Sequence, residues 1–240
     1  MEFNLIYIFF SVLFGLVFGS FISMASWRLP REEGLFKDSF CPKCRKKIGM
    51  KSLIPVFSWA WQGGKCSNCN QKISIRYPLI EIVTALLFVI SYMRFGDSLN
   101  TIIFDLILSV CLIMFVSDFE TYLIPDSLQI SLFILSLFFV LNNNYNMWAC
   151  LVDAFIYYCL IMLVAFFVKK WKKKEVLGMG DVKFIMIVGF VLGIESANLF
   201  FLFSGFIGTI FGILWTRFKG SEYYPFGPAL IASFLLLMII

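Results

Sequence analysis

The feature that most constrains this chain is a series of long apolar runs that recur along its whole length. A helix needs roughly 20 apolar residues to cross the hydrocarbon layer of a bilayer. About eight runs approach that length: 5–26, 79–95, 101–117, 127–141, 148–168, 182–194, 197–216 and 226–240. Charged residues make up only 15% of the chain, whereas a soluble domain carries roughly 25%. We therefore expect an all-α fold, a polytopic transmembrane helical bundle.

The first run, 5–26, also has the hydrophobicity of a secretion signal. It lacks a basic segment before it, is long for the apolar part of such a signal, and ends without an obvious small-residue cleavage site. We therefore interpret 1–26 as a retained first transmembrane helix. Residues 27–78 then form a polar loop, and 79–240 hold the remaining membrane helices.

The distribution of basic residues predicts the orientation of these spans, because Lys and Arg concentrate in cytoplasmic loops. Two basic clusters lie within 27–78 and 169–174. With the N-terminus outside, every Lys and Arg except Arg94 falls on the cytoplasmic side. The net charge of +5 therefore indicates membrane topology and contact with lipid headgroups, and we expect no nucleic-acid partner.

The polar loop 27–78 contains two CxxC pairs, Cys41 with Cys44 and Cys66 with Cys69. A loop of this size buries too little apolar surface to fold alone. Two CxxC turns present four thiolates in the arrangement of a tetrahedral, structural zinc site. Two disulfides or a redox pair are the alternatives, and a reducing cytoplasm argues against disulfides. The chain contains no histidine, which excludes a mixed Cys/His site and a histidine base.

Two aspartates stand at the predicted cytoplasmic ends of spans, where ionisable side chains are functional candidates. Asp118 follows the third run, and Asp181 precedes the sixth, directly after Gly178 and Gly180. Two carboxylates a few ångströms apart cannot both ionise easily, so one takes a proton from water while the other polarises a carbonyl. The pair therefore fits an aspartic peptidase, and the glycines would admit a substrate backbone or a neighbouring helix.

Simpler interpretations of the acidic residues stay open at this point. Asp181 suits the start of a helix dipole, and Asp118 suits a solvated loop. Asp126 is expected to N-cap the fourth membrane helix, and Glu81 to pair with Arg76 or line the site. A transporter and a zinc-stabilised scaffold are the other protein classes. Neither explains why acids and a glycine motif meet at one membrane level, and no internal repeat supports a transporter.

Six stretches, in order across nearly the full chain, resemble the type IV prepilin peptidases. They are Gly19-Ser20-Phe21 running to Arg28-Leu29-Pro30, the two CxxC pairs, Tyr77-Pro78-Leu79-Ile80-Glu81, Asp118 through Ile124-Pro125-Asp126, Gly178-Met179-Gly180-Asp181-Val182-Lys183, and Pro225-Phe226-Gly227-Pro228. Members of this family are bifunctional membrane enzymes that cut prepilin leader peptides and N-methylate the new N-terminus. A single GxGD stretch is a weak signal, whereas six ordered elements are specific.

The resemblance implies a GxGD-type membrane aspartic peptidase with Asp118 and Asp181 as its catalytic pair. It implies prepilin or pseudopilin substrates, cut after a glycine at the cytoplasmic face of the bacterial inner membrane. Pro228-Ala229-Leu230 resembles an element near the active site of related proteases, where a helix-breaking proline frees backbone groups for an extended substrate. The residues expected to bind substrate are Gly178, Gly180, Lys183 and Pro228.

The second activity that the resemblance implies is methyl transfer, with S-adenosylmethionine as the methyl donor. The region assigned to it contains Gly19, Ser20, Arg28 and Glu81. The family usually has Asn where this chain has Ser23, so a peptidase without methyltransferase activity is the alternative. The chain has no glycine-rich Rossmann fingerprint, and a conventional methyltransferase domain is therefore not expected.

Overall fold

A computed structural model describes residues 4–35, 37–41, 43–172, 178–220 and 223–240 of the chain. These residues form helices joined by loops, with two isolated β-bridges, so the all-α expectation is confirmed for them. Lys173 and Lys174 of the second basic cluster lie outside the described residues. The chain divides into two compact units, Met1–Asp105 and Leu106–Ile240.

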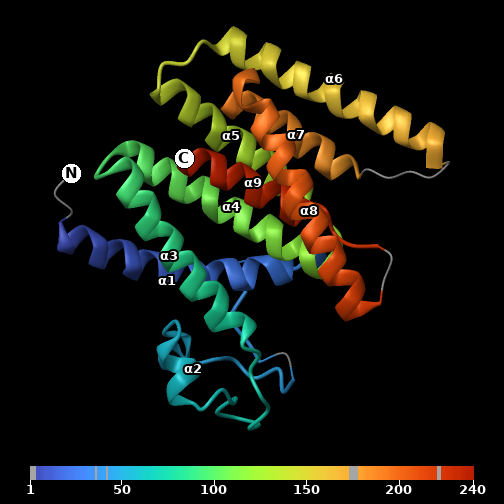
Figure 1. Ribbon diagram of the computed structural model, residues 1–240. Helices are drawn as coiled ribbons and strands as arrows, with labels where there is room; N and C mark the ends of the chain where they lie inside the picture. The colour runs from blue at the N-terminus through green and yellow to red at the C-terminus, as the bar shows by residue number, and fades with distance from the viewer. Residues whose placement is uncertain (1–3, 36, 42, 173–177, 221–222) are drawn as a thin grey trace. The chain divides into compact units, whose positions relative to one another are not determined.

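In the first unit, α1 (Leu5–Arg28) lies alongside α3 (Arg76–Phe95), as Figure 1 shows. Two glycines permit this contact. A Cβ at Gly15 would lie 2.5 Å from Ala85 Cα, and a Cβ at Gly19 would lie 2.5 Å from Glu81 Cα. Small residues four positions apart let two helix backbones approach closely in a membrane protein. Helix α3 therefore packs with α1 in this unit.

The segment between α1 and α3 contains short helices only: η1 (Leu29–Arg31), η2 (Met50–Leu53) and α2 (Phe57–Trp61). Two arginines link the elements of this region: Arg76 links the start of α3 to α1, and Arg28 links the end of α1 to the segment that follows it. The Arg76 guanidinium donates to Ser23 O at 3.0 Å and to Ser26 Oγ at 2.7 Å. The Arg28 guanidinium, 3% exposed, donates to the carbonyls of Gly34, Leu35, Lys37 and Asp38.

Helix α4 (Leu99–Thr121) begins in the first unit and continues into the second. The second unit also contains α5 (Asp126–Asn142), α6 (Met147–Lys172), α7 (Met179–Leu192), η3 (Ile194–Ser196), α8 (Ala197–Lys219) and α9 (Gly227–Ile239). Helix α7 packs against α5, α6 and α9. Its Gly189 faces the ring of Tyr157, where an added Cβ would lie 2.6 Å from the ring. This packing fixes the position of the first turn of α7.

Helix α5 begins one residue earlier than the sequence indicated. Pro125 occupies the N-cap position in an extended conformation, and Asp126 is the first helical residue. The expectation that Asp126 is an N-cap was therefore wrong. Its carboxylate instead forms an ion pair with Lys183, with Oδ1 and Nζ 2.6 Å apart.

Each predicted apolar run coincides with a helix to within a few residues. Among the described residues, five helices are long and apolar enough to cross a membrane: α1, α3, α4, α6 and α8, some with short extensions. The other three are shorter, with 17 residues in α5, 14 in α7 and 13 in α9. Thirteen helical residues rise only about 20 Å.

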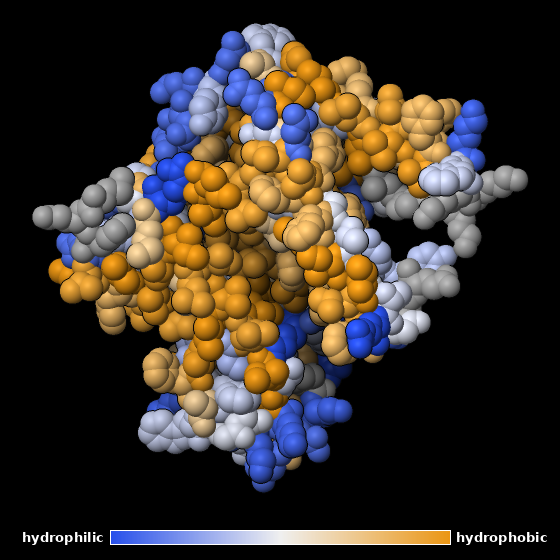
Figure 2. Space-filling view, viewed as in Figure 1, coloured by the Kyte–Doolittle hydropathy of each residue, from blue (hydrophilic) through white to orange (hydrophobic). Residues whose placement is uncertain are grey.

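Figure 2 shows that apolar side chains dominate the visible surface of the helices, whereas the segment between α1 and α3 is more hydrophilic. Together these features define an integral membrane protein.

Candidate functional site

Asp118 lies near the C-terminal end of α4 and is buried, with 7% of its surface exposed. Two side chains shape the turn that follows it. Ser117 Oγ donates to Leu123 O at 2.8 Å, and Thr121 Oγ1 donates to Ser117 O at 2.8 Å. Tyr122 adopts a left-handed backbone with φ 58°. The turn therefore folds back along α4 and carries Ile124 to the carboxylate.

The N-terminus of α9 meets the same carboxylate. A Cβ at Gly227, the first residue of α9, would lie 2.6 Å from Asp118 Oδ2 and 3.2 Å from Ile124 Cδ1. Only a residue without a side chain fits between them. Asp118 Oδ2 is buried and accepts no hydrogen bond within the described residues, which is rare for a carboxylate oxygen.

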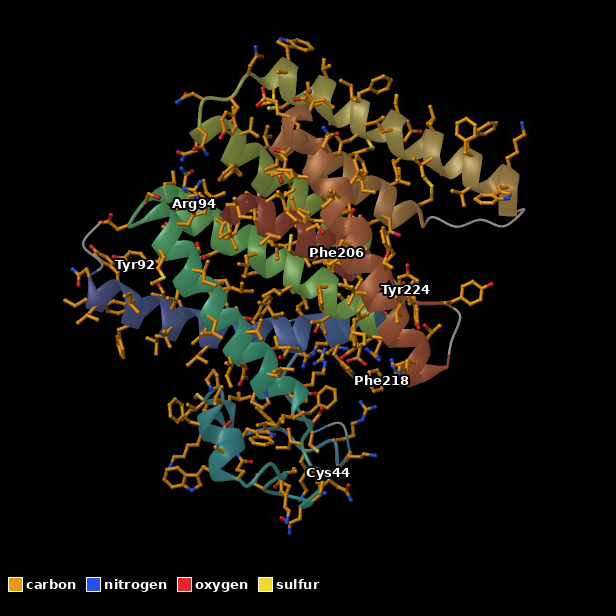
Figure 3. The ribbon with its side chains drawn as sticks, in the orientation of Figure 1. Cys44, Tyr92, Arg94, Phe206, Phe218 and Tyr224 are labelled. Carbon is orange, nitrogen blue, oxygen red and sulfur yellow. The ribbon has the colours of Figure 1, made fainter. Side chains whose placement is uncertain are left out.

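The approach of Gly227 depends on the preceding aromatic residues. A Cβ at Gly208 of α8 would lie 2.5 Å from the Phe226 ring, and one at Gly212 would lie 2.9 Å from the Tyr224 ring. Tyr224 accordingly lies next to α8 in Figure 3. The same face of α8 carries Trp215, whose ring contacts Phe119 edge-on, with centroids 5.2 Å apart. These contacts hold α8 and the start of α9 beside the last turn of α4.

Asp181 is half-buried in the first turn of α7. Its N–H donates to Gly178 O at 3.1 Å, and Gln129 Nε2 of α5 donates to Gly180 O at 2.9 Å. The carboxylate is within electrostatic reach of Asp118. Ile124 fills the space between the two sides of the site, because it contacts the position of a Cβ at Gly180 as well as at Gly227. The second unit therefore brings the two predicted catalytic aspartates together.

The residues predicted to bind substrate have different surroundings. Gly178 is exposed at the N-cap of α7, and a Cβ at Gly180 would make only ordinary contacts, the nearest at 3.5 Å. Lys183 is exposed and pairs with Asp126. Pro228 is buried in the first turn of α9, where a proline removes no helical hydrogen bond. It begins this helix and does not interrupt one.

The four cysteines of the first unit lie in two turns of matching geometry. In the first turn, Arg45 N donates to Cys41 O at 2.8 Å; in the second, Asn70 N donates to Cys66 O at 2.9 Å. Arg45 and Asn70 share a left-handed backbone, with φ 59° and 55°. Each turn is closed by an antiparallel bridge, Phe40 with Lys47 and Lys65 with Lys72. The two CxxC pairs are thus equivalent structural units that face one another.

The sulfur atoms of Cys41, Cys44, Cys66 and Cys69 all lie within 4.8 Å of one another. Tetrahedral coordination with zinc–sulfur bonds of about 2.3 Å separates the sulfurs by about 3.8 Å, and Cys41 Sγ and Cys69 Sγ are 4.0 Å apart. All four cysteines are free, so the disulfide alternative is not observed. The cluster therefore fits a metal ion held by four thiolates. Cys44 marks this module in Figure 3.

The thiols of this cluster differ in acidity. The backbone N–H groups of Asn68 and Cys69 lower the pKa of Cys66 to about 7. The backbone N–H of Gln71 acts in the same direction on Cys69, but burial and the neighbouring thiols of Cys66, Cys44 and Cys41 outweigh it and raise the pKa of Cys69 to about 11. A metal bound by all four thiolates would therefore displace protons from the cluster.

The four residues assigned to methyl transfer also come together in the first unit. Gly19 lies against Glu81 at the contact of α1 with α3. Ser20, Arg28 and Glu81 line a cavity of about 340 Å³ between these helices and the cysteine module. Glu81 is 6% exposed and accepts a hydrogen bond from Val56 N at 2.6 Å. The expected pairing of Glu81 with Arg76 is not found, because Arg76 donates to Ser23 and Ser26 instead.

Three functional positions were missed as site residues in the sequence. Gly227 and Ile124 were part of recognised motifs, but nothing local indicated that they lie beside Asp118. Val56 had no signal of its own. It lies in an apolar, proline-containing stretch, which is compatible with a turn. The Pro-Phe-Gly-Pro stretch at 225–228 was the signal that could have identified Gly227.

The fold and the two sites define a class of protein: an integral membrane protein that pairs two aspartates at helix ends and carries a separate four-thiol module. Comparison with known proteins narrows this class. Residues 13–95 match the model of the bacterial peptidase A24 N-terminal domain, and residues 106–213 match the type IV leader peptidase family. No solved structure matches the chain.

Several curated relatives are similar over nearly the whole chain. A prepilin leader peptidase/N-methyltransferase from Bacillus subtilis (strain 168) is 33% identical over 229 residues, covering 93% of this chain and 90% of the relative. The protein of that name from Neisseria gonorrhoeae is 33% identical, covering 93% and 87%. The one from Vibrio cholerae is 29% identical, covering 95% and 94%. The chain therefore belongs to the type IV leader peptidase family, among the prepilin leader peptidase/N-methyltransferases.

Proposed function

We propose that this chain is a membrane aspartic endopeptidase that cleaves the leader peptide of type IV prepilins or pseudopilins and N-methylates the new N-terminus with S-adenosylmethionine. The observation that carries the peptidase is the convergence of Asp118 and Asp181 from α4 and α7 in one site. The names of its relatives support both activities. A peptidase without methyltransferase activity is the second candidate, motivated by Ser23 in place of the usual Asn.

In the peptidase reaction, one aspartate is ionised and the other protonated. The ionised carboxylate removes a proton from water, whose oxygen attacks the carbonyl carbon of the scissile bond. The protonated carboxyl donates to the carbonyl oxygen. When the tetrahedral intermediate collapses, the C–N bond breaks and the leaving amine takes a proton from a carboxyl group. This cycle needs no histidine, serine or cysteine nucleophile, consistent with a chain that has no histidine.

The protein around the pair supplies rigidity. On the Asp118 side, Gly227 and Ile124 are closely packed next to the carboxylate. On the Asp181 side, the hydrogen bond from Gln129 holds Gly180 in place. Fixed carboxylates of this kind lower the cost of reorganisation in the transition state. Three residues near Asp181 in sequence are proposed to contact the substrate. Gly178 and Lys183 are exposed, and Gly180 is half-buried. Pro228 is proposed to act there by positioning Gly227.

The proposed location is the bacterial inner membrane, with the N-terminus outside and the active site facing the cytoplasm. The one-sided distribution of Lys and Arg supports this orientation. The shorter helices α5, α7 and α9 would complete about eight spans. A prepilin has a short leader ahead of an apolar helix, so its cleavage point would reach the membrane surface where the two aspartates are proposed to lie. Lipid headgroups, not nucleic acid, are the proposed partners of the basic loops.

Zinc is the proposed metal of the four-cysteine module. Four thiolate ligands complete a tetrahedral shell, which leaves no coordination position for water and favours a structural role. The chemistry that zinc would supply is therefore cross-linking of the two CxxC turns. Cys41, Cys44, Cys66 and Cys69 would hold it.

The proposal is tested by co-expressing a prepilin with the full chain and measuring the mass of the product. Cleavage removes the leader, and methylation adds one methyl group to the new N-terminus. Asp118→Asn and Asp181→Asn are each expected to lower cleavage by about 10²- to 10⁴-fold, while Asp97→Asn, an exposed carboxylate, leaves it unchanged. Cleavage at the normal rate by either active-site variant would overturn the mechanism. An unmethylated but correctly cut product would select the peptidase-only alternative.

A further inference from the structure

The cavity of the first unit has walls of unlike chemistry. Its volume is about 340 Å³, within the usual range for small-molecule sites of roughly 300–1,000 Å³. Aromatic rings line it from four segments: Trp27 at the end of α1, Phe40 before the first CxxC turn, Trp59 in α2 and Tyr77 in α3. Lys43 and Lys72 line it from the cysteine module. Glu81 of α3 is the one acidic side chain that lines it.

The Glu81 carboxylate is buried without a cation. It accepts hydrogen bonds from Val56 N and from the Ser20 hydroxyl, and no ion pair to it is found in the described part of the chain. Arg28, which also lines the cavity, and Arg76 donate to backbone carbonyls and to Ser26. Because buried carboxylates are normally paired with a cation, the charge of Glu81 indicates a positively charged ligand.

The backbone contact to Glu81 is itself strained. Val56 has φ 61° and ψ −53°, and Phe57 N donates to Pro55 O at 2.6 Å across it. A β-branched residue in this region costs about 1–3 kcal/mol and is found mainly at functional sites. The strain aims the Val56 N–H at the carboxylate and fixes its orientation at the cavity wall.

A second polar atom in the cavity wall also lacks a partner. Ser23 is 1% exposed, and its Oγ forms no hydrogen bond in the described residues. Ser23 lines the cavity together with Ser20 and Glu81. A buried hydroxyl without a partner is unfavourable by about 1–3 kcal/mol. Ser23 and Glu81 together therefore indicate that a polar, cationic ligand contacts this end of the cavity.

We propose that this cavity binds S-adenosylmethionine, with Glu81 facing its sulfonium or ammonium charge, aromatic rings such as Trp59 stacking on the adenine, and Lys43 or Lys72 taking the carboxylate. The assignment rests on the proposed methyltransferase function. The ligand matches the walls: it carries two positive charges, one negative charge and a flat heterocycle.

The transfer that this site would support is balanced without a further reactant. The neutral amine of the cleaved pilin forms a C–N bond with the methyl carbon as the C–S bond breaks. The bonding electrons pass to sulfur, which leaves as a neutral thioether. The methylated amine then gives its extra proton to water. Glu81 acts by binding and orienting the cationic donor.

Equilibrium dialysis of the purified full chain against labelled S-adenosylmethionine tests the site. Glu81→Gln keeps an oxygen acceptor for Val56 N but removes the charge. It should weaken S-adenosylmethionine binding by about tenfold or more, and S-adenosylhomocysteine, which lacks the sulfonium charge, by a smaller factor. Ser23→Leu should abolish binding of both by filling the cavity. Glu32→Gln, an exposed carboxylate of the same unit that does not line the cavity, is the matched control and should bind as the unmodified chain does.

Zinc content reports whether each variant has folded. A photoreactive azido analogue of the donor provides a measurement that needs no variant: it should label segments that include Phe40 or Trp59. Unchanged affinity in both folded variants, or labelling confined to residues after 105, would overturn the site while the methyltransferase function stands. Failure of the unmodified chain both to bind the donor and to methylate a cleaved pilin would instead overturn the proposed function and the site together.

Discussion

Gly227, the first residue of α9, lies directly against the carboxylate of Asp118 near the end of α4, where an added Cβ would be 2.6 Å from Oδ2. The two residues are far apart in sequence. The rings of Tyr224 and Phe226, just before Gly227, pack on Gly212 and Gly208 of α8. The position of this carboxylate, which we propose to be catalytic, therefore depends on a glycine that carries no chemistry.

Gly227→Ala is expected to lower the rate of leader cleavage by about 10²-fold, because a displacement of about 1 Å at a reacting group costs that much. The added methyl group cannot fit without moving the carboxylate or the start of α9. Initial rates on a purified prepilin would measure the effect. Gly205→Ala is the matched control, since a Cβ at Gly205 of α8 meets no described atom within 4 Å. Equal rates for the two variants would contradict the role of Gly227.

Cys66→Ser is expected to reduce zinc from about one ion per chain to nearly none and to lower the unfolding temperature, because loss of one thiolate opens the four-ligand shell. Metal analysis and thermal unfolding of the purified protein would measure both. Cys159→Ser, on an exposed position of α6, should change neither property. A native protein that contains no zinc would contradict the assignment of this metal.

Gly15→Leu is expected to destabilise the first unit by about 1–3 kcal/mol, the usual cost of overpacking a close contact. A Cβ at this position would lie 2.5 Å from Ala85 Cα, so the backbones of α1 and α3 would have to separate. Denaturant unfolding in detergent would measure the change. Val12→Leu on the exposed side of α1 adds the same kind of group without this contact, and an equal loss in both variants would argue against the glycine contact.

Much of the fold follows from local patterns, because helix length and apolar composition are properties of continuous segments. The ends of the helices lie within a few residues of the predicted runs, and the two CxxC turns were predicted as one cluster. The contact of Gly227 with Asp118 was not predictable in this way, since it depends on how α8 and α9 pack. The hydrogen bond from the strained Val56 to Glu81 likewise joins two segments that are distant in sequence and leaves no local pattern. At Asp126, a shift of one residue caused by Pro125 converted an expected cap into an ion pair.

The ion pair of Lys183 with Asp126 separates a structural role from contact with substrate. Both side chains are largely exposed, at 45% and 70%, so the pair contributes about 1 kcal/mol or less to stability. Lys183→Asp should lower cleavage strongly, because it removes the ammonium group and places a second carboxylate against Asp126. If Lys183 only pairs with Asp126, the exchange Lys183→Asp with Asp126→Lys restores the ion pair and the rate. If Lys183 contacts the substrate, as we propose, the double exchange stays as slow as Lys183→Asp, while Asp126→Asn alone cleaves within about threefold of the unmodified chain. Initial cleavage rates of the three variants and the unmodified chain, with unfolding measured in parallel, distinguish the two roles. Full recovery in the double exchange would contradict substrate contact by Lys183.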